Sequence, residues 1–206
     1  MRVPRDLWQA LRRLSVWVEP MLVAEWTRLS QRYAELKGRT LPTDTVAAAL
    51  RWFDPQRETE RARRRALALL DEGRPICCVW SERRLDERTL DIDHCLPWSA
   101  WPCDDLWNLM PAHRRVNQHE KRERIVSGEL LKRAEGPITE WWQRAYLTEA
   151  PELIRSRFWH EARGTLPLFA SDLREEDLGD ILLGIEMQRR RIKHDQQLEE
   201  WHGLAR

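Results

Sequence analysis

The sequence predicts an α+β protein that is predominantly α-helical, in which a helical body surrounds a central module of two strands and a helix. Two observations support this prediction. Apolar residues recur at helical spacing both before residue 75 and after residue 127. Between them, residues 76–81 and 89–96 have the short, apolar-rich pattern typical of strands. No Gly/Ser linker separates these parts, so we expect one compact body with divisions at 1–74, 75–127 and 128–206.

Composition bounds the class of protein. A hydrophobic content of 42% with 33% charged residues is typical of a soluble globular chain and argues against disorder. The net charge of +1 gives no overall attraction to nucleic acid, so any such attraction must come from local clusters. The chain has no apolar run near the ~18–20 residues of a membrane span, and its N-terminus lacks the apolar core of a secretory signal. We therefore expect a cytoplasmic protein with no membrane partner.

The N-terminal part, residues 1–74, is expected to be helical. Residues 4–18 carry apolar side chains on one face, and Pro20 should end that helix. Residues 22–36 follow as a second amphipathic helix, for which Gly38 is a candidate C-terminal cap. Two further helices are expected over residues 43–53 and 55–70.

The central module, residues 75–127, is expected to pair residues 76–81 with residues 89–96 as two strands joined by a polar turn. A Trp-rich loop follows, in which Asp104 and Asp105 are expected to cap a turn or helix. Pro111 can then open a helix that continues to about Ile125.

The C-terminal part, residues 128–206, again has helical spacing. Helices are expected from Pro137, over residues 151–163, and from Ser171 onward. The last of these becomes very polar between Arg189 and Lys193, so its end is either solvated or a partner-binding arm. A protein partner or a homodimer contact would use this helix.

The candidate chemistry lies in the central module. Asp93 is a hard carboxylate suited to Mg²⁺, and His94 beside it can accept a proton near neutral pH. Asn117 can offer a second oxygen ligand from the following helix, and Lys121 lies on the same helical face. These parts are the ones that metal-assisted cleavage of a phosphodiester requires. Asp91, His113 and His119 are expected to be solvated.

Basic residues gather around this helix and could contact the phosphates of a nucleic acid. Between residues 109 and 125 there are five basic residues against two Glu, a local charge of +3. The five are Arg114, Arg115, Lys121, Arg122 and Arg124.

Three stretches of the sequence resemble the HNH, or ββα-metal, endonucleases. These are DIDHCLPWS (91–99), DDLWNLMP (104–111) and RRVNQHEK (114–121), and their spacing is similar to that of the HNH domain in RNA-guided CRISPR nucleases. The resemblance implies that His94 is the general base that activates water and that Asp93 and Asn117 bind the metal. It also implies that Asn108 holds the loop that orients the base.

The departures from the family pattern bear on the metal. Variants that bind transition metals carry a His where this chain has Lys121. The lysine therefore favours Mg²⁺ as the metal, with Mn²⁺ as an alternative. It also favours a contact of Lys121 with phosphate. The family often shows N-x-x-K where this chain has N-x-x-x-K. No structural zinc is expected, because the four cysteines form no CxxC pair.

The sequence therefore predicts a Mg²⁺-dependent endonuclease that hydrolyses DNA, with RNA as an alternative substrate, in bacterial or phage defence. A second hypothesis is a nucleic-acid-binding or assembly subunit of a defence or CRISPR-type complex, whose module cuts only within that complex. A third is an intracellular toxin-type nuclease. Nicking of plasmid DNA by the isolated chain would separate the first from the second.

Overall fold

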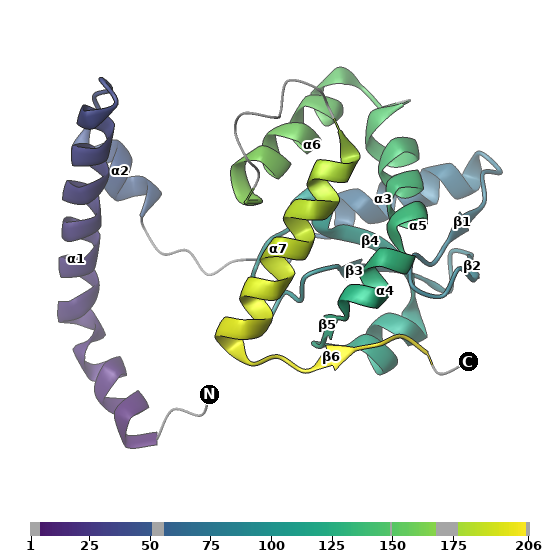
Figure 1. Ribbon diagram of the computed structural model, residues 1–206, viewed down its shortest axis with the longest axis horizontal. Coiled ribbons are helices and arrows are strands. Elements are labelled where there is room, and N and C mark those ends of the chain that lie inside the picture. The colour runs from purple at the N-terminus through teal and green to yellow at the C-terminus, as the bar shows by residue number, and fades with distance from the viewer. Residues whose placement is uncertain (1–4, 51–55, 149, 168–176, 205–206) are drawn as a thin grey trace. The chain divides into compact units, whose positions relative to one another are not determined.

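The computed structural model describes residues 5–50, 56–148, 150–167 and 177–204 (Figure 1). The chain divides into two compact units, Met1–Pro55 and Gln56–Arg206, rather than the one body expected. We call them the N-terminal unit and the C-terminal unit. The divisions predicted at residues 74/75 and 127/128 remain a prediction. The described residues are predominantly helical, and no helix among them has the length and apolarity needed to span a membrane.

The N-terminal unit consists of helix α1 (Arg5–Leu36) and the short helix α2 (Thr43–Ala49). The predicted break at Pro20 is wrong, because α1 continues through it. Proline removes one backbone N–H, and a long helix can lose one hydrogen bond without ending. Gly38 forms the expected C-terminal cap of α1, with a φ of +66°. The N–H of the next residue, Arg39, donates to the Ala34 carbonyl at 2.9 Å. The last residues of the helix predicted over 43–53 lie outside the described ranges.

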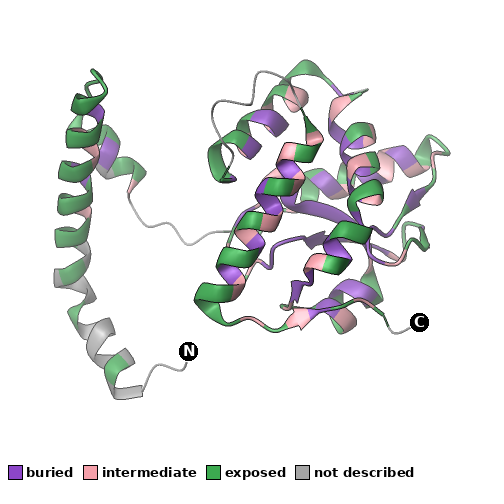
Figure 2. Cartoon of the chain, in the orientation of Figure 1, coloured by how far each residue is buried: buried purple, intermediate pink, exposed green. Residues whose placement is uncertain are grey.

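The face of α1 that bears the predicted apolar stripe is largely exposed (Figure 2). Leu22, Trp26 and Tyr33 are each more than half exposed, whereas Thr27 and Ala34 are buried. Exposed apolar side chains in this number are typical of a surface that contacts another molecule. Within this unit the stripe is therefore not used for folding.

The C-terminal unit contains the other elements. They are α3 (Glu60–Asp71), β1 (Ile76–Cys77), β2 (Arg84–Leu85), β3 (Leu90–His94), η1 (Leu106–Asn108), β4 (Leu109–His113), η2 (Val116–Lys121), β5 (Ile125–Val126), α4 (Gly128–Arg133), α5 (Glu135–Trp142), η3 (Gln143–Leu147), α6 (Glu152–Thr165), α7 (Leu178–Gln196) and β6 (Glu200–Trp201). Helix α3 begins at Glu60, later than predicted, and the predicted start of the last helix at Ser171 lies outside the described residues.

The strands pair differently from the prediction. β1 pairs with β2, and β3 pairs antiparallel with β4, so the predicted pairing of residues 76–81 with 89–96 is wrong. His94 lies opposite Leu109, and Ile92 lies opposite Pro111. Pro111 is therefore a strand residue and opens no helix; its carbonyl accepts the Val79 N–H at 3.0 Å. Proline is tolerated there because a two-stranded ribbon leaves edge positions that need no N–H donor.

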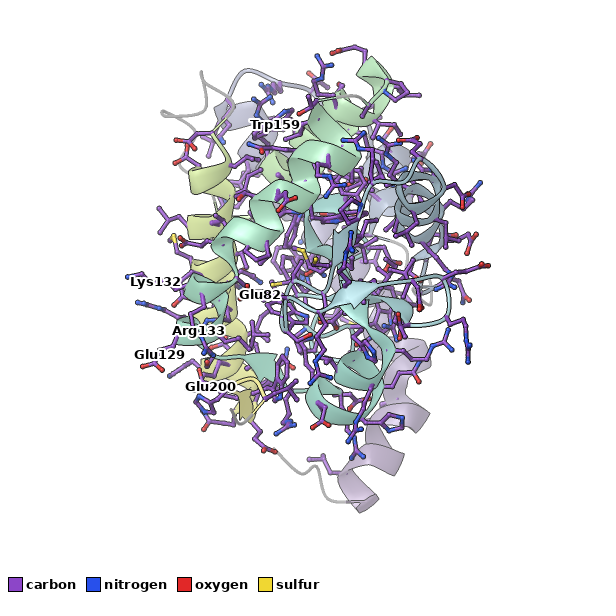
Figure 3. All side chains as sticks on the ribbon, turned by 90° about the vertical axis from the view of Figure 1, so that its right-hand side faces the viewer. Glu82, Glu129, Lys132, Arg133, Trp159 and Glu200 are labelled. Atoms are coloured by element: carbon purple, nitrogen blue, oxygen red, sulfur yellow. The ribbon has the colours of Figure 1, made fainter. Side chains whose placement is uncertain are left out.

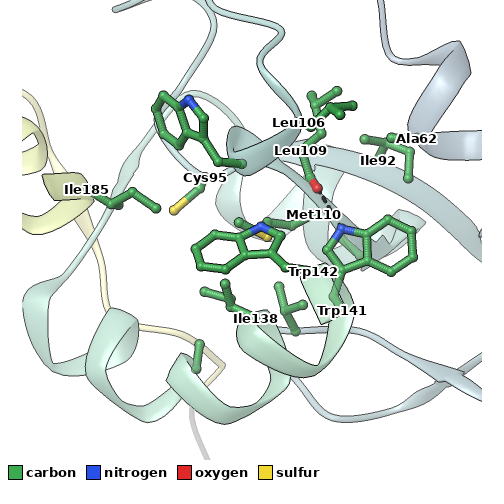
Figure 4. Packing of buried hydrophobic residues seen from close by; sticks show 14 of the residues in the cluster. Ala62, Ile92, Cys95, Leu106, Leu109, Met110, Ile138, Trp141, Trp142 and Ile185 are labelled. Atoms are coloured by element: carbon green, nitrogen blue, oxygen red, sulfur yellow. Dashed lines mark hydrogen bonds between the residues drawn. The ribbon is translucent and has the colours of Figure 1, made fainter. Parts of the chain in front are cut away.

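The core of this unit lies around the β3–β4 ribbon, where buried positions are concentrated in Figure 2. Helices α3 and α5 contact β4, and the Trp141 indole donates to the Leu109 carbonyl at 2.9 Å (Figure 4). Trp142, Tyr146 and Phe158 are fully buried beside them. Each of these aromatic side chains buries a large apolar area. The ribbon that carries Asp93 and His94 is thus held rigidly.

The end of α7 packs on the C-terminal strand. Arg189 is buried and donates to Glu186 and to Glu200 of β6, the latter at 2.8 Å. Figure 3 shows that Glu200 lies on the same side of this unit as Glu129 and Lys132 of α4. Part of the basic run that was expected to be either solvated or a partner-binding arm therefore serves folding, and a protein-partner or homodimer contact through this helix remains a prediction.

Candidate active site

A cleft of about 1040 Å³ opens beside β3 and η2 in the C-terminal unit. Its wall includes Asp93, His94 and Asn117, three of the four residues selected from the sequence, together with Asp91. They meet because β3 ends at His94 and η2 lies against the same strand. Residues separated by more than twenty positions in the chain thus share one surface.

The His94 imidazole is buried and held on both of its nitrogen atoms. Nε2 lies 2.7 Å from Asp104 Oδ1, and Nδ1 lies 3.3 Å from Arg57 Nη2. The ring of Trp98 lies 5.3 Å from the imidazole, centroid to centroid, and limits its rotation. Burial lowers the pKa of His94 below its ordinary value, and the hydrogen bond with Asp104 opposes that shift. A lowered pKa favours the neutral imidazole, the form that can accept a proton.

The Asp93 carboxylate, the candidate metal ligand, is enclosed by hydrogen-bond donors. Its side chain is almost fully buried; Oδ1 accepts the Lys121 ammonium at 2.9 Å and Oδ2 accepts the Trp80 indole N–H at 2.7 Å. Lys121 is itself fully buried and also donates to the His94 carbonyl at 2.7 Å. The expected contact of Lys121 with a DNA phosphate does not hold in this structure, because its ammonium is enclosed and paired with Asp93.

The extra residue between Asn117 and Lys121 has a structural explanation. η2 is a π-helix, which has more residues per turn than an α-helix. Residues four apart lie on one face of η2, as they also do in an α-helix, and the side chains of Asn117 and Lys121 both contact β3. Asn117 donates through Nδ2 to Asp91 Oδ2 at 3.0 Å and to the Ile92 carbonyl at 3.2 Å. The spacing N-x-x-x-K thus keeps both contacts with the strand.

Asn108 is fully buried and ties together the two ends of the loop after His94. Its Oδ1 accepts the Leu96 N–H at 2.8 Å, and its Nδ2 donates to the Cys103 carbonyl at 2.9 Å. The loop between these contacts runs from Leu96 to Cys103, so it starts just after His94 and ends just before Asp104. This geometry agrees with a loop-holding function and places Asn108 away from the cleft wall.

Comparison with known proteins identifies this part of the chain. Residues 78–127 match the family described as HNH endonuclease. The central module belongs to the HNH family. Residues 1–50 separately match a family described as a domain of unknown function (DUF8808). No curated protein matches the chain. We call residues 78–127 the HNH module, and its family indicates a nuclease of the HNH type with a nucleic-acid substrate.

The basic residues predicted around the HNH module are divided by the fold. Arg122 and Arg124 line the cleft, whereas Arg114 and Arg115 do not. Arg122 follows η2 with a φ of +54°, a backbone conformation that residues other than glycine seldom adopt. Arg57, which the sequence did not single out, also lines the cleft. The cleft therefore combines an arginine that precedes the HNH module with two from the end of the module. Four carboxylates line it as well, those of Asp91, Asp93, Glu123 and Glu199.

Two side chains of the HNH module, Asp93 and Asn117, carry oxygen atoms of the kind that bind divalent cations. Among the residues that the structure describes, no three His, Cys, Asp or Glu side chains form a metal-binding group. Mg²⁺ needs fewer protein ligands, since it retains water molecules and binds one or two carboxylates together with phosphate oxygens. Asp93 and Asn117 supply such oxygen atoms on the cleft wall, and Asp91 lies beside them. A cation held there would share Asp93 with the Lys121 ammonium.

Two residues at His94 were missed in the sequence. Asp104 was expected to cap a turn, but it contacts the imidazole instead. Arg57 lies 37 residues before His94 and outside the HNH match, so no spacing could connect them. The sequence did contain a signal for the contact between Asp104 and His94, because Asp104 is an acidic residue that follows the candidate base within one short loop.

Proposed function

We propose that this chain is a metal-dependent endonuclease that hydrolyses DNA phosphodiester bonds, with His94 as the general base. One observation carries the proposal: a buried imidazole with a lowered pKa faces a cleft whose wall also holds Asp93 and Asn117. A base at this site must be neutral at physiological pH and close to the metal ligands. The membership of the central module in the HNH family supports the same assignment.

In the proposed reaction the Nδ1 atom of His94 accepts a proton from a water molecule. The oxygen of that water bonds to phosphorus, the bond from phosphorus to the 3′ oxygen breaks, and the 3′ oxygen takes a proton from solvent. His94 then returns its proton to solvent. Asp93 and Asn117 would hold Mg²⁺, which when bound stabilises negative charge on the phosphate and on the leaving oxygen.

The arginines of the cleft would hold the DNA backbone. Arg57, Arg122 and Arg124 line the cleft and can neutralise the phosphates nearest to His94. Arg57 donates weakly to His94 Nδ1, so a phosphate that attracts its guanidinium would release this nitrogen for catalysis. Because the net charge of the chain is only +1, binding should depend on few contacts and weaken moderately with salt.

The decisive experiment is nicking of supercoiled plasmid by the purified chain with Mg²⁺, with and without EDTA. His94→Ala should remove cleavage, at least about a 100-fold fall in rate, while the circular dichroism spectrum stays unchanged. His160→Ala, which removes an exposed histidine on α6, is the matched control and should cut at the parent rate. A His94→Ala chain that cuts as fast as the parent would show that another group is the base.

A second function is favoured by one observation, the exposed apolar stripe of α1 in the N-terminal unit. A chain that assembles into a larger complex would cover such a surface. Under this alternative the HNH module cuts only in the complex. Absence of nicking by the isolated chain, with Mg²⁺ or with Mn²⁺, would favour it over the autonomous nuclease.

A further inference from the structure

The hydrogen bonds around His94 determine which of its nitrogen atoms carries the proton. A carboxylate only accepts hydrogen bonds, so Asp104 Oδ1 at 2.7 Å requires a hydrogen on Nε2. A guanidinium only donates, so Arg57 Nη2 at 3.3 Å requires a lone pair on Nδ1. Two neighbours from different segments therefore select the same neutral tautomer.

Asp104 is itself held in place. Its second oxygen, Oδ2, accepts the Glu58 backbone N–H at 2.7 Å. The preceding residue, Cys103, is bonded through its carbonyl to Asn108, which also bonds Leu96 on the other side of the loop. Asp104 is thus held by the Glu58 N–H and by the contacts of Asn108 with the adjoining loop, and only about a fifth of its side chain is exposed.

We propose that Asp104 is the positioning residue of this active site: it holds His94 as the Nε2–H tautomer, so that Nδ1 is the atom that takes the proton from water. This inference rests on the proposed role of His94 as the base. The carboxylate also stabilises the imidazolium that forms when Nδ1 accepts that proton, since the positive ring then lies against a negative charge. Asn108 acts one step further away, through the loop that carries Asp104.

The geometry indicates what the amide variant Asp104→Asn would do. The Glu58 N–H needs an acceptor, so the amide oxygen would turn toward it and the NH₂ group would face His94. His94 Nε2 would then have to accept, which moves the hydrogen to Nδ1. This is the wrong tautomer for a base that acts through Nδ1. The substitution thus changes the imidazole while leaving a side chain of nearly the same shape.

The first test is spectroscopic and needs no nuclease activity. In the full chain labelled with ¹⁵N-histidine, long-range ¹H–¹⁵N spectra at neutral pH report the tautomer of each of the six histidines. The His94→Gln variant identifies the His94 signals. We expect the Nε2–H form in the parent and the Nδ1–H form in Asp104→Asn. An Nδ1–H or doubly protonated His94 in the parent would overturn the proposal, as would an unchanged tautomer in Asp104→Asn.

The second test separates catalysis from binding. Asp104→Asn should lower the single-turnover rate of plasmid nicking by about 100-fold or more and leave the affinity for an uncleaved DNA duplex unchanged. The matched control is Asp105→Asn, which removes the neighbouring carboxylate that bonds Trp107 and Thr165 and does not contact His94. Equal rates in the two variants would overturn the proposal. If the parent chain fails to nick DNA, the proposed function fails, while the tautomer measurement still decides the pairing of Asp104 with His94.

Discussion

The buried pair of Lys121 and Asp93 predicts a large and selective loss of stability. Lys121→Met removes an ammonium that is fully enclosed and leaves the Asp93 carboxylate with the Trp80 indole as its remaining donor. The His94 carbonyl loses a donor as well. Removing one member of a buried ion pair destabilises a protein by about 3–5 kcal/mol, because the other charge stays buried without compensation.

The double variant Asp93→Asn with Lys121→Met provides the sharper measurement. It removes both charges, so most of the loss should be recovered and the double variant should be more stable than Lys121→Met alone. The control is Lys132→Met on α4, an exposed position where a change of at most about 0.5 kcal/mol is expected.

Urea unfolding followed by circular dichroism measures these differences. With the usual dependence of about 1–3 kcal/mol per molar urea, Lys121→Met should lower the midpoint by roughly 1–2 M or more. Lys132→Met should leave the midpoint nearly unchanged. A Lys121→Met midpoint within error of the parent, or a double variant less stable than the single one, would refute the buried pairing.

Three further predictions concern other parts of the C-terminal unit. Asn117→Ala should weaken the binding of Mn²⁺, measured by calorimetry in the absence of DNA, by about 10-fold or more, because one of two proposed oxygen ligands is lost; equal affinity would remove Asn117 from the site. Under native conditions a thiol reagent should modify Cys77, which is exposed, and spare Cys95, whose pKa burial raises to about 12, as mass spectrometry of the labelled peptides would show. Hydrogen bonds from Lys193 and Arg189 hold the pKa of Glu200 below its ordinary value, so Glu200→Gln should reduce stability by about 1 kcal/mol at pH 7. That difference should shrink as the pH falls from about 4.5, the ordinary value at which the unfolded chain takes up a proton, through the lowered pKa of Glu200 in the folded chain, below which the folded carboxylate is protonated too; a difference independent of pH would contradict the charge pairing.

The extent to which the fold could be predicted differs between local and long-range features. The cap at Gly38 and the helical segments after residue 127 follow from spacing and from single residues with strong conformational preferences. The partner of β3 could not be found in this way, because a strand pattern states which side chains are buried and not which strand lies beside it. Pro111 illustrates the difficulty: the same residue suits the first turn of a helix and the edge of a ribbon, and the contact with Val79 decides between them.

The candidate site shows the same division. The order and spacing of Asp93, His94, Asn108 and Asn117 brought the HNH family into view from the sequence, and the fold brings three of them to one cleft. The contact made by Lys121 could not be predicted, since a lysine four residues after a candidate ligand can bind either a phosphate or a buried carboxylate. Burial of its ammonium depends on Asp93 and on Trp80, which come from separate segments.

By itself the sequence determined which residues could perform the chemistry, because residue type and spacing within a short segment limit what each side chain can reach. Only the tertiary structure decided how they are arranged: it placed Asp104 on one nitrogen of His94 and Arg57 on the other, and it turned Lys121 inward. The physical reason is that hydrogen bonds and burial depend on the distance between atoms in space, and chain contacts across tens of residues set that distance. The residue that the sequence offered as a candidate base is, in the fold, a buried imidazole held by two charged neighbours.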